Sequence, residues 1–295
     1  MKKSIFFATI AVAVVLAGCN KNNDTQESAV NPDEIRVETV LPTRATQTTF
    51  EAGDRMGLFA VEYDGDTVAP LQIAGNYINN EPMTYDGTEW HAPRTLYWST
   101  KACDFYGIYP YIQLGAVDDV LFDIVADQNS ARTADALGGY EASDLLWAKA
   151  EHAEKADGAV HLQFRHMMSR LVVKVAKGPK FEGKIPDDIT AHIYNTATTA
   201  KVNYVKGSLE KYIFSDNRTI TMRKVDNETF DAIVVPQFIE RSTPLVEITM
   251  GGIAYLLEYS MTFRPGYCHT LTLTLNTSPD QEKIEIAIDG EIENW

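Results

Sequence analysis

The sequence predicts an all-β protein built from β-sandwiches, and three observations support this prediction. Apolar and polar residues alternate with a period of two in several segments, as Leu271, Leu273 and Leu275 do between threonines. Gly-Gly and Asp-Gly pairs separate neighbouring strand-like runs, which is typical of β-hairpins. Such runs recur along most of the 295 residues, of which 45% are hydrophobic, enough for a large core.

The amino-terminal segment predicts export. Two lysines precede an apolar run at 5–16, which is shorter than the ~20 residues that a membrane-spanning helix needs and suits a signal peptide. The run ends in LAGC at 16–19, which resembles the lipobox of bacterial lipoproteins. We therefore expect residues 1–18 to be removed and Cys19 to carry lipid that holds the chain at the outer membrane. The alternative is an ordinary signal peptide with an incidental cysteine.

The next segment combines a polar stretch with a short apolar strand. Residues 19–34 are mostly polar and lack periodicity, so we interpret them as a tether. Ile35, Val37 and Leu41 share a parity and can present one apolar face to a core. Pro42 would end this strand.

Further strands follow in the first half of the chain. Asp64-Gly65 and Asp86-Gly87 predict hairpins, and Val160, Leu162 and Phe164 share a strand parity. Residues 142–156 are rich in Ala, Glu, Lys and Leu, which favours a helix by propensity. The alternative, which we favour slightly, is a buried strand at 144–147 followed by a charged loop.

The second half begins after a break rich in Gly, Pro and charge at 177–188. We place the domain boundary there, with one domain at 35–176 and another at 177–295. Gly251-Gly252 predicts a further hairpin between 245–250 and 253–259. Ile284, Ile286 and Ile288 alternate with polar or small residues and predict a strand near the end of the chain.

Charge and cysteine content narrow the function classes. The formal net charge is −15, and no basic stripe offsets it, so we do not expect nucleic-acid binding. Cys103 and Cys268 could form a disulfide in an exported protein. Because both lie in apolar segments far apart in the sequence, we favour two buried thiols.

Candidate chemical sites are weak. His161 and His166 would lie on opposite faces of a strand, so they are a poor metal pair, and we expect His166 to be a hydrogen-bonded core residue. Phosphate-loop, Gly-x-Ser-x-Gly and catalytic-cysteine motifs are absent from the sequence. We therefore predict neither an enzyme nor a bound cofactor or metal. Tyr106, Tyr109 and Tyr111 with Trp98 could stack on sugars, but core packing is the better interpretation.

Several segments, taken in order, resemble one known family. They are TRAT (43–46), FEAGDRMGLF (50–59), YW (97–98), DFYGIYPY (104–111), DLLWA (144–148), FRHMMSRL (164–171), VVPQ (234–237), PGY (265–267) and the terminal Trp295. Together with the lipobox, they resemble the fimbrillin superfamily, the Bacteroidales lipoproteins that build type V pili, including its Mfa-like members.

The resemblance implies two tandem transthyretin-like β-sandwich domains with Greek-key-type connections. It also implies a structural or adhesive subunit of a cell-surface pilus. In this family a trypsin-like protease removes an amino-terminal strand, and a strand from the next subunit fills the vacated groove. The implied partners are other pilus subunits, outer-membrane lipid, the protease and a host or glycan ligand.

This chain carries residues that such a reaction needs. Arg44 is followed by the small Ala45 in a polar segment, so we predict cleavage there and removal of the strand within 35–44, rather than at Arg36 inside it. The alternative is a tether with an incidental arginine. The strand with Ile284, Ile286 and Ile288 is a candidate donor strand, although the last strand of the second sandwich is the favoured interpretation. A rival function is a surface lipoprotein that binds glycans and never polymerises; an extracellular hydrolase is less favoured.

Overall fold

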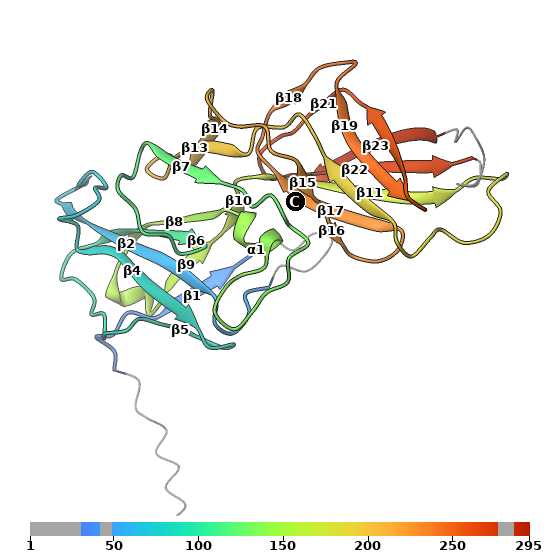
Figure 1. Ribbon diagram of the computed structural model, residues 1–295. Coiled ribbons are helices and arrows are strands. Elements are labelled where there is room, and N and C mark those ends of the chain that lie inside the picture. The colour runs from blue at the N-terminus through green and yellow to red at the C-terminus, as the bar shows by residue number, and fades with distance from the viewer. Residues whose placement is uncertain (1–30, 42–48, 277–285) are drawn as a thin grey trace, which may run out of the picture. The chain divides into compact units, whose positions relative to one another are not determined.

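The structure, a computed structural model, describes residues 31–41, 49–276 and 286–295 (Figure 1). The chain divides into two units, Met1–Asn31 and Pro32–Trp295, and the fold described here is that of the second. Within the described ranges, helical structure is confined to α1 (Gly139–Ser143) and a 3-10 turn at Lys155–Asp157, and neither could cross a membrane. The prediction of an all-β protein is confirmed.

The largest sheet is antiparallel and belongs to the first half of the chain. Its strand order is β10-β8-β6-β2-β4-β5, and β3 pairs with β2. The strands are β2 (Arg55–Asp64), β3 (Thr67–Val68), β4 (Ile78–Tyr85), β5 (Trp90–His91), β6 (Cys103–Tyr109), β8 (Leu146–Ala153) and β10 (Arg165–His166).

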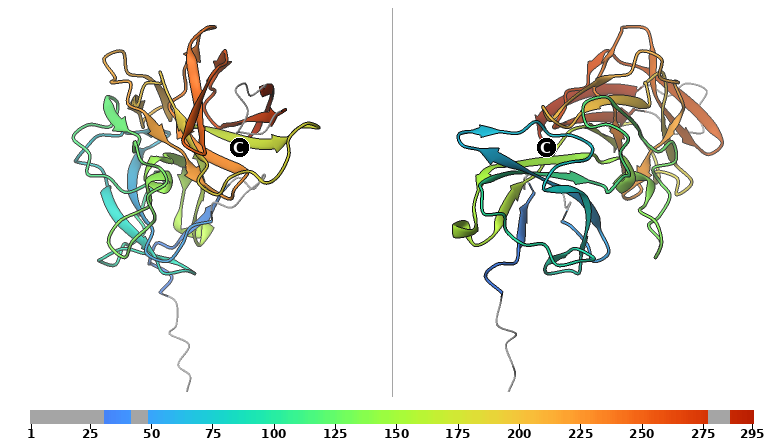
Figure 2. Two further views of the ribbon diagram at one scale, coloured as in Figure 1. Left: turned by 45° about the vertical axis from the view of Figure 1, so that its right-hand side comes forward. Right: turned by 90° about the vertical axis from the view of Figure 1, so that its left-hand side faces the viewer.

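Both faces of this sheet are covered, which explains why every residue of β6 is buried. On one face lie β1 (Val37–Val40) and β9 (Val160–Gln163), a parallel pair of strands (Figures 1 and 2). Leu58 and Phe105 of the sheet pack in one cluster with residues of this pair. On the other face, Phe59 and Ile108 belong to a cluster that continues into the second half of the chain. Alternate side chains of one strand therefore serve two different cores.

The second half forms a five-stranded and a four-stranded sheet. The five-stranded sheet has the order β16-β17-β11-β22-β23, and the four-stranded sheet has the order β15-β12-β19-β20. The strands of the first are β11 (Ser169–Lys177), β16 (Arg223–Lys224), β17 (Thr229–Val234), β22 (Tyr267–Leu275) and β23 (Ile286–Asn294). The strands of the second are β12 (Thr190–Ile193), β15 (Ile220–Thr221), β19 (Pro244–Met250) and β20 (Ile253–Glu258).

Two small sheets complete the fold. One contains β7 (Val120–Asp123), β13 (Thr199–Asn203) and β14 (Ser208–Lys211), and so joins the two halves of the chain by hydrogen bonds. The other contains β18 (Phe238–Ile239) and β21 (Met261–Thr262).

Most local predictions are confirmed. Hairpins form at Asp64-Gly65, Asp86-Gly87 and Gly251-Gly252, which link β2 to β3, β4 to β5 and β19 to β20. The leucines of β22 that share a parity are all buried. The helix considered for 142–156 is wrong, because β8 occupies most of that segment. The favoured strand at 144–147 forms in part, but it begins at Leu146 and continues to Ala153, where the sequence predicts a charged loop. Hydrogen bonding to β6 and burial of Leu146 and Ala148 outweigh the helical propensity.

The two-domain division stays a prediction, but strand pairing bears on its boundary. The predicted break after residue 176 would leave most of β11 in the first domain. β11 instead pairs antiparallel with β17 and parallel with β22, so residues 169–176 share a sheet with the second half. A boundary ahead of Ser169 fits this pairing better.

Candidate functional site

The amino-terminal strand lies between two neighbours. On one side, β1 pairs in parallel with β9 from Val37↔Val160 to Val40↔Gln163. On the other side, the residues just before β1 bond to the segment after β5, where the Ile35 amide donates to the Leu96 carbonyl at 2.8 Å. Residues 35–40 therefore occupy a slot that is bordered by β9 along β1 and by the segment around Leu96 ahead of β1, both distant in sequence.

The inward face of this strand is apolar, as its sequence parity predicted. Ile35 and Val37 are each 6% exposed, and Leu41 packs half-buried against the same cluster. Between them, the Thr39 hydroxyl accepts a hydrogen bond from the Trp90 indole at 3.1 Å. Burial of two aliphatic side chains stabilises the strand by about 3–6 kcal/mol.

The outward face makes few contacts. Arg36, Glu38 and Val40 are exposed, and Val40 keeps 58% of its surface accessible. Glu38 lies 3.2 Å from His161 in an exposed pair, which contributes little to stability. Apolar packing therefore holds only the inward face of β1, and backbone hydrogen bonds hold it to its neighbours. Removal of the strand would expose apolar residues on that one face only.

The floor of the slot is tightly packed. Leu162 and Phe164 are at most 1% exposed and lie over Gly107 of β6. A Cβ atom at Gly107 would lie 2.7 Å from Cζ of Phe164 and 2.9 Å from Cδ1 of Leu162. Glycine at this position allows β6 and the β9 segment to approach closely.

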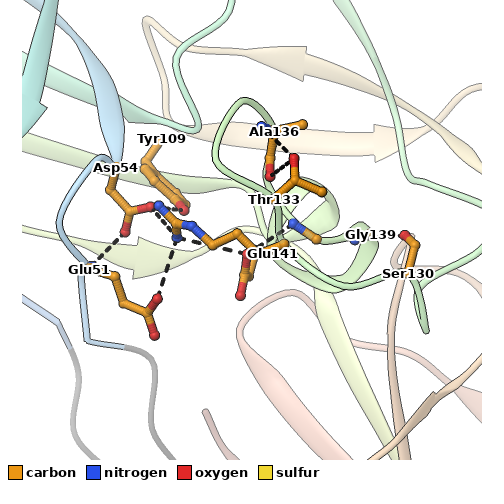
Figure 3. A network of polar contacts seen from close by, with 10 residues as sticks. Glu51, Asp54, Tyr109, Ser130, Thr133, Ala136, Gly139 and Glu141 are labelled. Atoms are coloured by element: carbon orange, nitrogen blue, oxygen red, sulfur yellow. Dashed lines mark hydrogen bonds and ion pairs between the residues drawn. The ribbon is translucent and has the colours of Figure 1, made fainter.

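A polar network fixes the chain shortly after the predicted cleavage position. Glu51 and Asp54, from one turn, face Glu141 of α1 (Figure 3), and Arg132 Nη1 lies 3.7, 2.8 and 3.8 Å from the carboxylates of Glu51, Asp54 and Glu141. Asp54 is buried and also accepts hydrogen bonds from the Glu51 amide at 2.8 Å and the Tyr109 hydroxyl at 3.2 Å.

The network has electrostatic consequences for its own members. Burial raises the pKa of Tyr109 far above its usual value, and the neighbouring Asp54 charge adds to the shift. The phenol therefore stays protonated and remains a donor to Asp54. A cavity of about 490 Å³ borders the network and is lined by both Leu41 and Thr49. Sequence reasoning missed Arg132, because no pattern links it to carboxylates about eighty residues earlier.

Some predicted site residues lie outside the described residues. They are the lipidation residue Cys19, the cleavage residues Arg44 and Ala45, and Ile284 of the candidate donor strand. Ile286 and Ile288 are described, and they pair with Leu275 and Leu273 as part of β23. This strand therefore occupies the edge of its own five-stranded sheet.

The other candidate residues behave mainly as core. His166 Nδ1 lies 2.9 Å from Asp144, and the Trp295 ring stacks on the imidazole at 3.7 Å. His161 lies on the exposed outer surface, and the described residues contain no cluster that could hold a metal ion. Tyr106 and Tyr109 are buried, which confirms the core interpretation for these two members of the aromatic group.

The two described cysteines are buried thiols, as predicted. Burial raises the pKa of the Cys103 thiol to about 11, with smaller contributions from Glu62 and Asp104. This thiol is therefore protonated and poorly nucleophilic at neutral pH.

Comparison with known proteins identifies the family. A family model described as fimbrillin-like matches residues 43–295. The whole chain aligns at 24% identity with 96% of a Bacteroides uniformis protein described as the fimbrium subunit Fim1C. A Bacteroides ovatus protein described as the fimbrium tip subunit Fim1C is 27% identical over 59% of this chain and 36% of its own length.

Solved structures share the fold. A crystal structure described as a cell adhesion protein of Bacteroides uniformis covers 89% of this chain and 99% of its own, with a TM-score of 0.63 and 23% identity. A second, from Bacteroides ovatus, covers 89% and 97% with a TM-score of 0.65 and 16% identity. Since the family model spans most of the sequence, the chain belongs to the fimbrillin-like family, within the fimbrillin superfamily of the Bacteroidales.

Proposed function

We propose that this chain is a structural or adhesive subunit of a cell-surface fimbria, exported as a lipoprotein and assembled by donor-strand exchange. Its family and the relatives described as fimbrium subunits support the fimbrial role. The one-sided burial of β1 is the observation that carries the strand exchange. The proposal assigns no catalytic activity to this chain.

The first step is export and anchoring. Acylated Cys19 holds the chain at the outer membrane, and the polar residues up to 34 separate the lipid from the folded part. The acidic protein would otherwise have little affinity for an anionic membrane surface.

The second step is cleavage after Arg44 by a trypsin-like protease. This cut converts β1 from a covalent part of the fold into a bound peptide that can dissociate. Its departure would uncover the backbone edge of β9 and the side chains of Leu162 and Phe164. The contacts of Arg132 with Glu51 and Asp54 would keep the remaining chain in place.

The third step is insertion of a strand from another subunit. A row of unpaired backbone donors and acceptors above an apolar floor favours addition of an extended segment with alternating apolar residues. A contact of this kind is head-to-tail, so repetition builds a filament rather than a closed ring.

β23 is the candidate donor. It is an edge strand, and most of its residues are exposed, although Ile286 and Ile288 face the core in part. Donation requires β23 to leave β22, its partner along nine residue pairs. If β23 stays in its own sheet, the donor must be a segment of another pilus subunit.

Cleavage is tested by comparing Arg44→Ala with Arg36→Ala after treatment with an Arg-specific protease. Arg36 is exposed and its side chain donates to the Gly158 carbonyl at 3.3 Å, so it is a matched control within the same strand region. We expect Arg44→Ala to give a folded monomer and Arg36→Ala to give SDS-resistant ladders. Ladders from the Arg44→Ala protein, or no ladders from the wild type, would refute the cleavage step.

The donor is tested by a reversible crosslink. Thr272 and Asp289 are register partners on β22 and β23, so Thr272→Cys with Asp289→Cys can tie the two strands together. The equivalent pair on β19 and β20, Thr249→Cys with Ala254→Cys, is the control. Polymerisation that stops on oxidation and resumes on reduction, in the first variant alone, supports β23. Polymerisation of the oxidised first variant would exclude it.

A further inference from the structure

A second concave site borders the β1 slot through Phe164 and extends to the end of β23. Its volume is about 730 Å³, and it is lined by the ends of β8 and β10, the turn before β14, and residues 265–266 and 294–295. Lys149 and Arg165 line it together with His166, whose Nδ1 lies 2.9 Å from Asp144, and none of its described lining side chains is a carboxylate. This composition is unusual in a chain with a net charge of −15.

Arg165 is held in a fixed orientation at this site. It is the cross-strand partner of Trp147, and its guanidinium lies 4.7 Å from the centre of the Trp147 ring. Its Nη2 donates to the Gly207 carbonyl at 2.5 Å. No ion pair among the described residues involves Arg165, so its charge is not compensated by a neighbouring carboxylate there.

Gly207 makes this arrangement possible. Its φ is +60°, and a Cβ atom there would lie 2.5 Å from Arg165 Nη2 and 2.8 Å from the Trp147 ring. Only glycine therefore allows Trp147, Arg165 and the turn to pack together. The guanidinium is positioned by the fold before any ligand arrives, which lowers the entropy lost on binding.

The second cation, Lys149, is already paired with carboxylates. Lys149 Nζ lies 2.9 Å from both Asp104 and Glu151, and neither carboxylate lines the site. The charge of Lys149 is therefore largely compensated, and Arg165 is the principal anion-attracting group. Gln163, Ser208 and Asn294 are exposed and add neutral hydrogen-bonding groups around the cavity.

From these contacts we infer that the Arg165 cavity binds a carboxylated sugar. A planar guanidinium matches a carboxylate in two parallel hydrogen bonds, which a neutral sugar cannot form. Amide and hydroxyl side chains suit ring hydroxyls, and the cavity has the size of small-ligand sites. The carboxylated sugar would be the ligand in the adhesive role proposed above, and only its adhesive function rests on that proposal. The cavity shares Phe164 with the β1 slot and Asn294 with β23, but Arg165 belongs to neither, so loss of sugar binding in an Arg165 variant is distinguishable from loss of polymerisation.

Calorimetric titration of the full-length protein with sodium glucuronate and N-acetylneuraminate tests the inference. Two neutral sugars, glucose and the methyl ester of glucuronate, test whether binding requires the carboxylate. Arg165→Gln removes the guanidinium, and Arg55→Gln is the matched control, because Arg55 also lies over an aromatic ring, 4.8 Å from Tyr111, outside the cavity. Thermal unfolding confirms that each variant is folded.

We expect saturable binding of at least one acid, and about tenfold or more weaker binding of its uncharged counterpart. Arg165→Gln should weaken binding by at least the same factor, while Arg55→Gln should leave it unchanged. Absence of binding to both acids, equal binding of the methyl ester, or full binding by Arg165→Gln would overturn the inference. Arg165-dependent binding of an acidic peptide in place of both sugars would also overturn it.

Discussion

Replacement of Ile35 by alanine should destabilise the precursor of this protein but not its assembled form. Ile35 is 6% exposed in the cluster beneath β1, so its truncation leaves a cavity in the intact chain. We expect a loss of about 3 kcal/mol in the free energy of unfolding. In a subunit that has exchanged β1 for a foreign strand, residue 35 is gone, and the same substitution should have no effect.

Urea unfolding followed by tryptophan fluorescence measures this difference, since the Trp90 indole donates to Thr39 in β1. Val40→Ala is the matched control on the exposed face and should change the stability of the intact chain by less than about 0.5 kcal/mol. Leu162→Ala, in the floor of the slot, should destabilise precursor and polymer alike. Equal losses for Ile35→Ala in both forms would show that β1 is retained, and the strand-exchange reasoning would be wrong.

Three further predictions concern the core. Gly107→Ala should lower the free energy of unfolding by about 1–3 kcal/mol in urea denaturation, because its Cβ would press against Phe164; an unchanged midpoint would contradict this. Asp231→Asn should cost about 3–5 kcal/mol in the same assay, because the fully buried carboxylate bonds Arg170 and a second arginine; a loss under 1 kcal/mol would argue against this pairing. Burial, aided by nearby Arg264, lowers the pKa of His269 to about 4. The neutral imidazole therefore stabilises the fold fully above the unfolded-state pKa of ~6.5. This stabilisation declines as the pH falls towards 4, by up to about 3 kcal/mol. The His269→Phe protein should show a correspondingly flatter pH dependence, and an NMR-measured pKa near 6.5 for His269 would refute the assignment.

Local patterns predicted which residues of each strand face inward. Leu271 and Leu273 of β22 and Ile35 and Val37 of the first strand are buried, as their parity requires. The sequence favours a strand at 144–147 only slightly, because alanine-rich sequence supports a helix in isolation. Hydrogen bonding to β6 through most of β8, and to β10 at Leu146 and Trp147, decides the matter.

The polar sites could not be predicted in the same way. Arg132 and Asp54 are far apart in the sequence, and neither carries a motif that identifies the other. Arg165 belongs to a segment that supported the family resemblance, yet its charge environment depends on the Gly207 turn and on carboxylates elsewhere in the chain. Electrostatic partners of this kind follow from the packing of the whole fold.

By itself, the sequence determined the strand periodicity, the hairpin turns and a resemblance that the family match confirms. Tertiary structure decided that β1 pairs with β9 and that β11 joins the strands of the second half. It also decided that the Arg165 guanidinium, which has no carboxylate partner within the described part of the chain, lines a cavity. The physical reason is the separation along the chain over which each kind of interaction acts. Alternation and turn chemistry act over a few residues, whereas strand partners and charge neighbours are selected by packing across the whole chain.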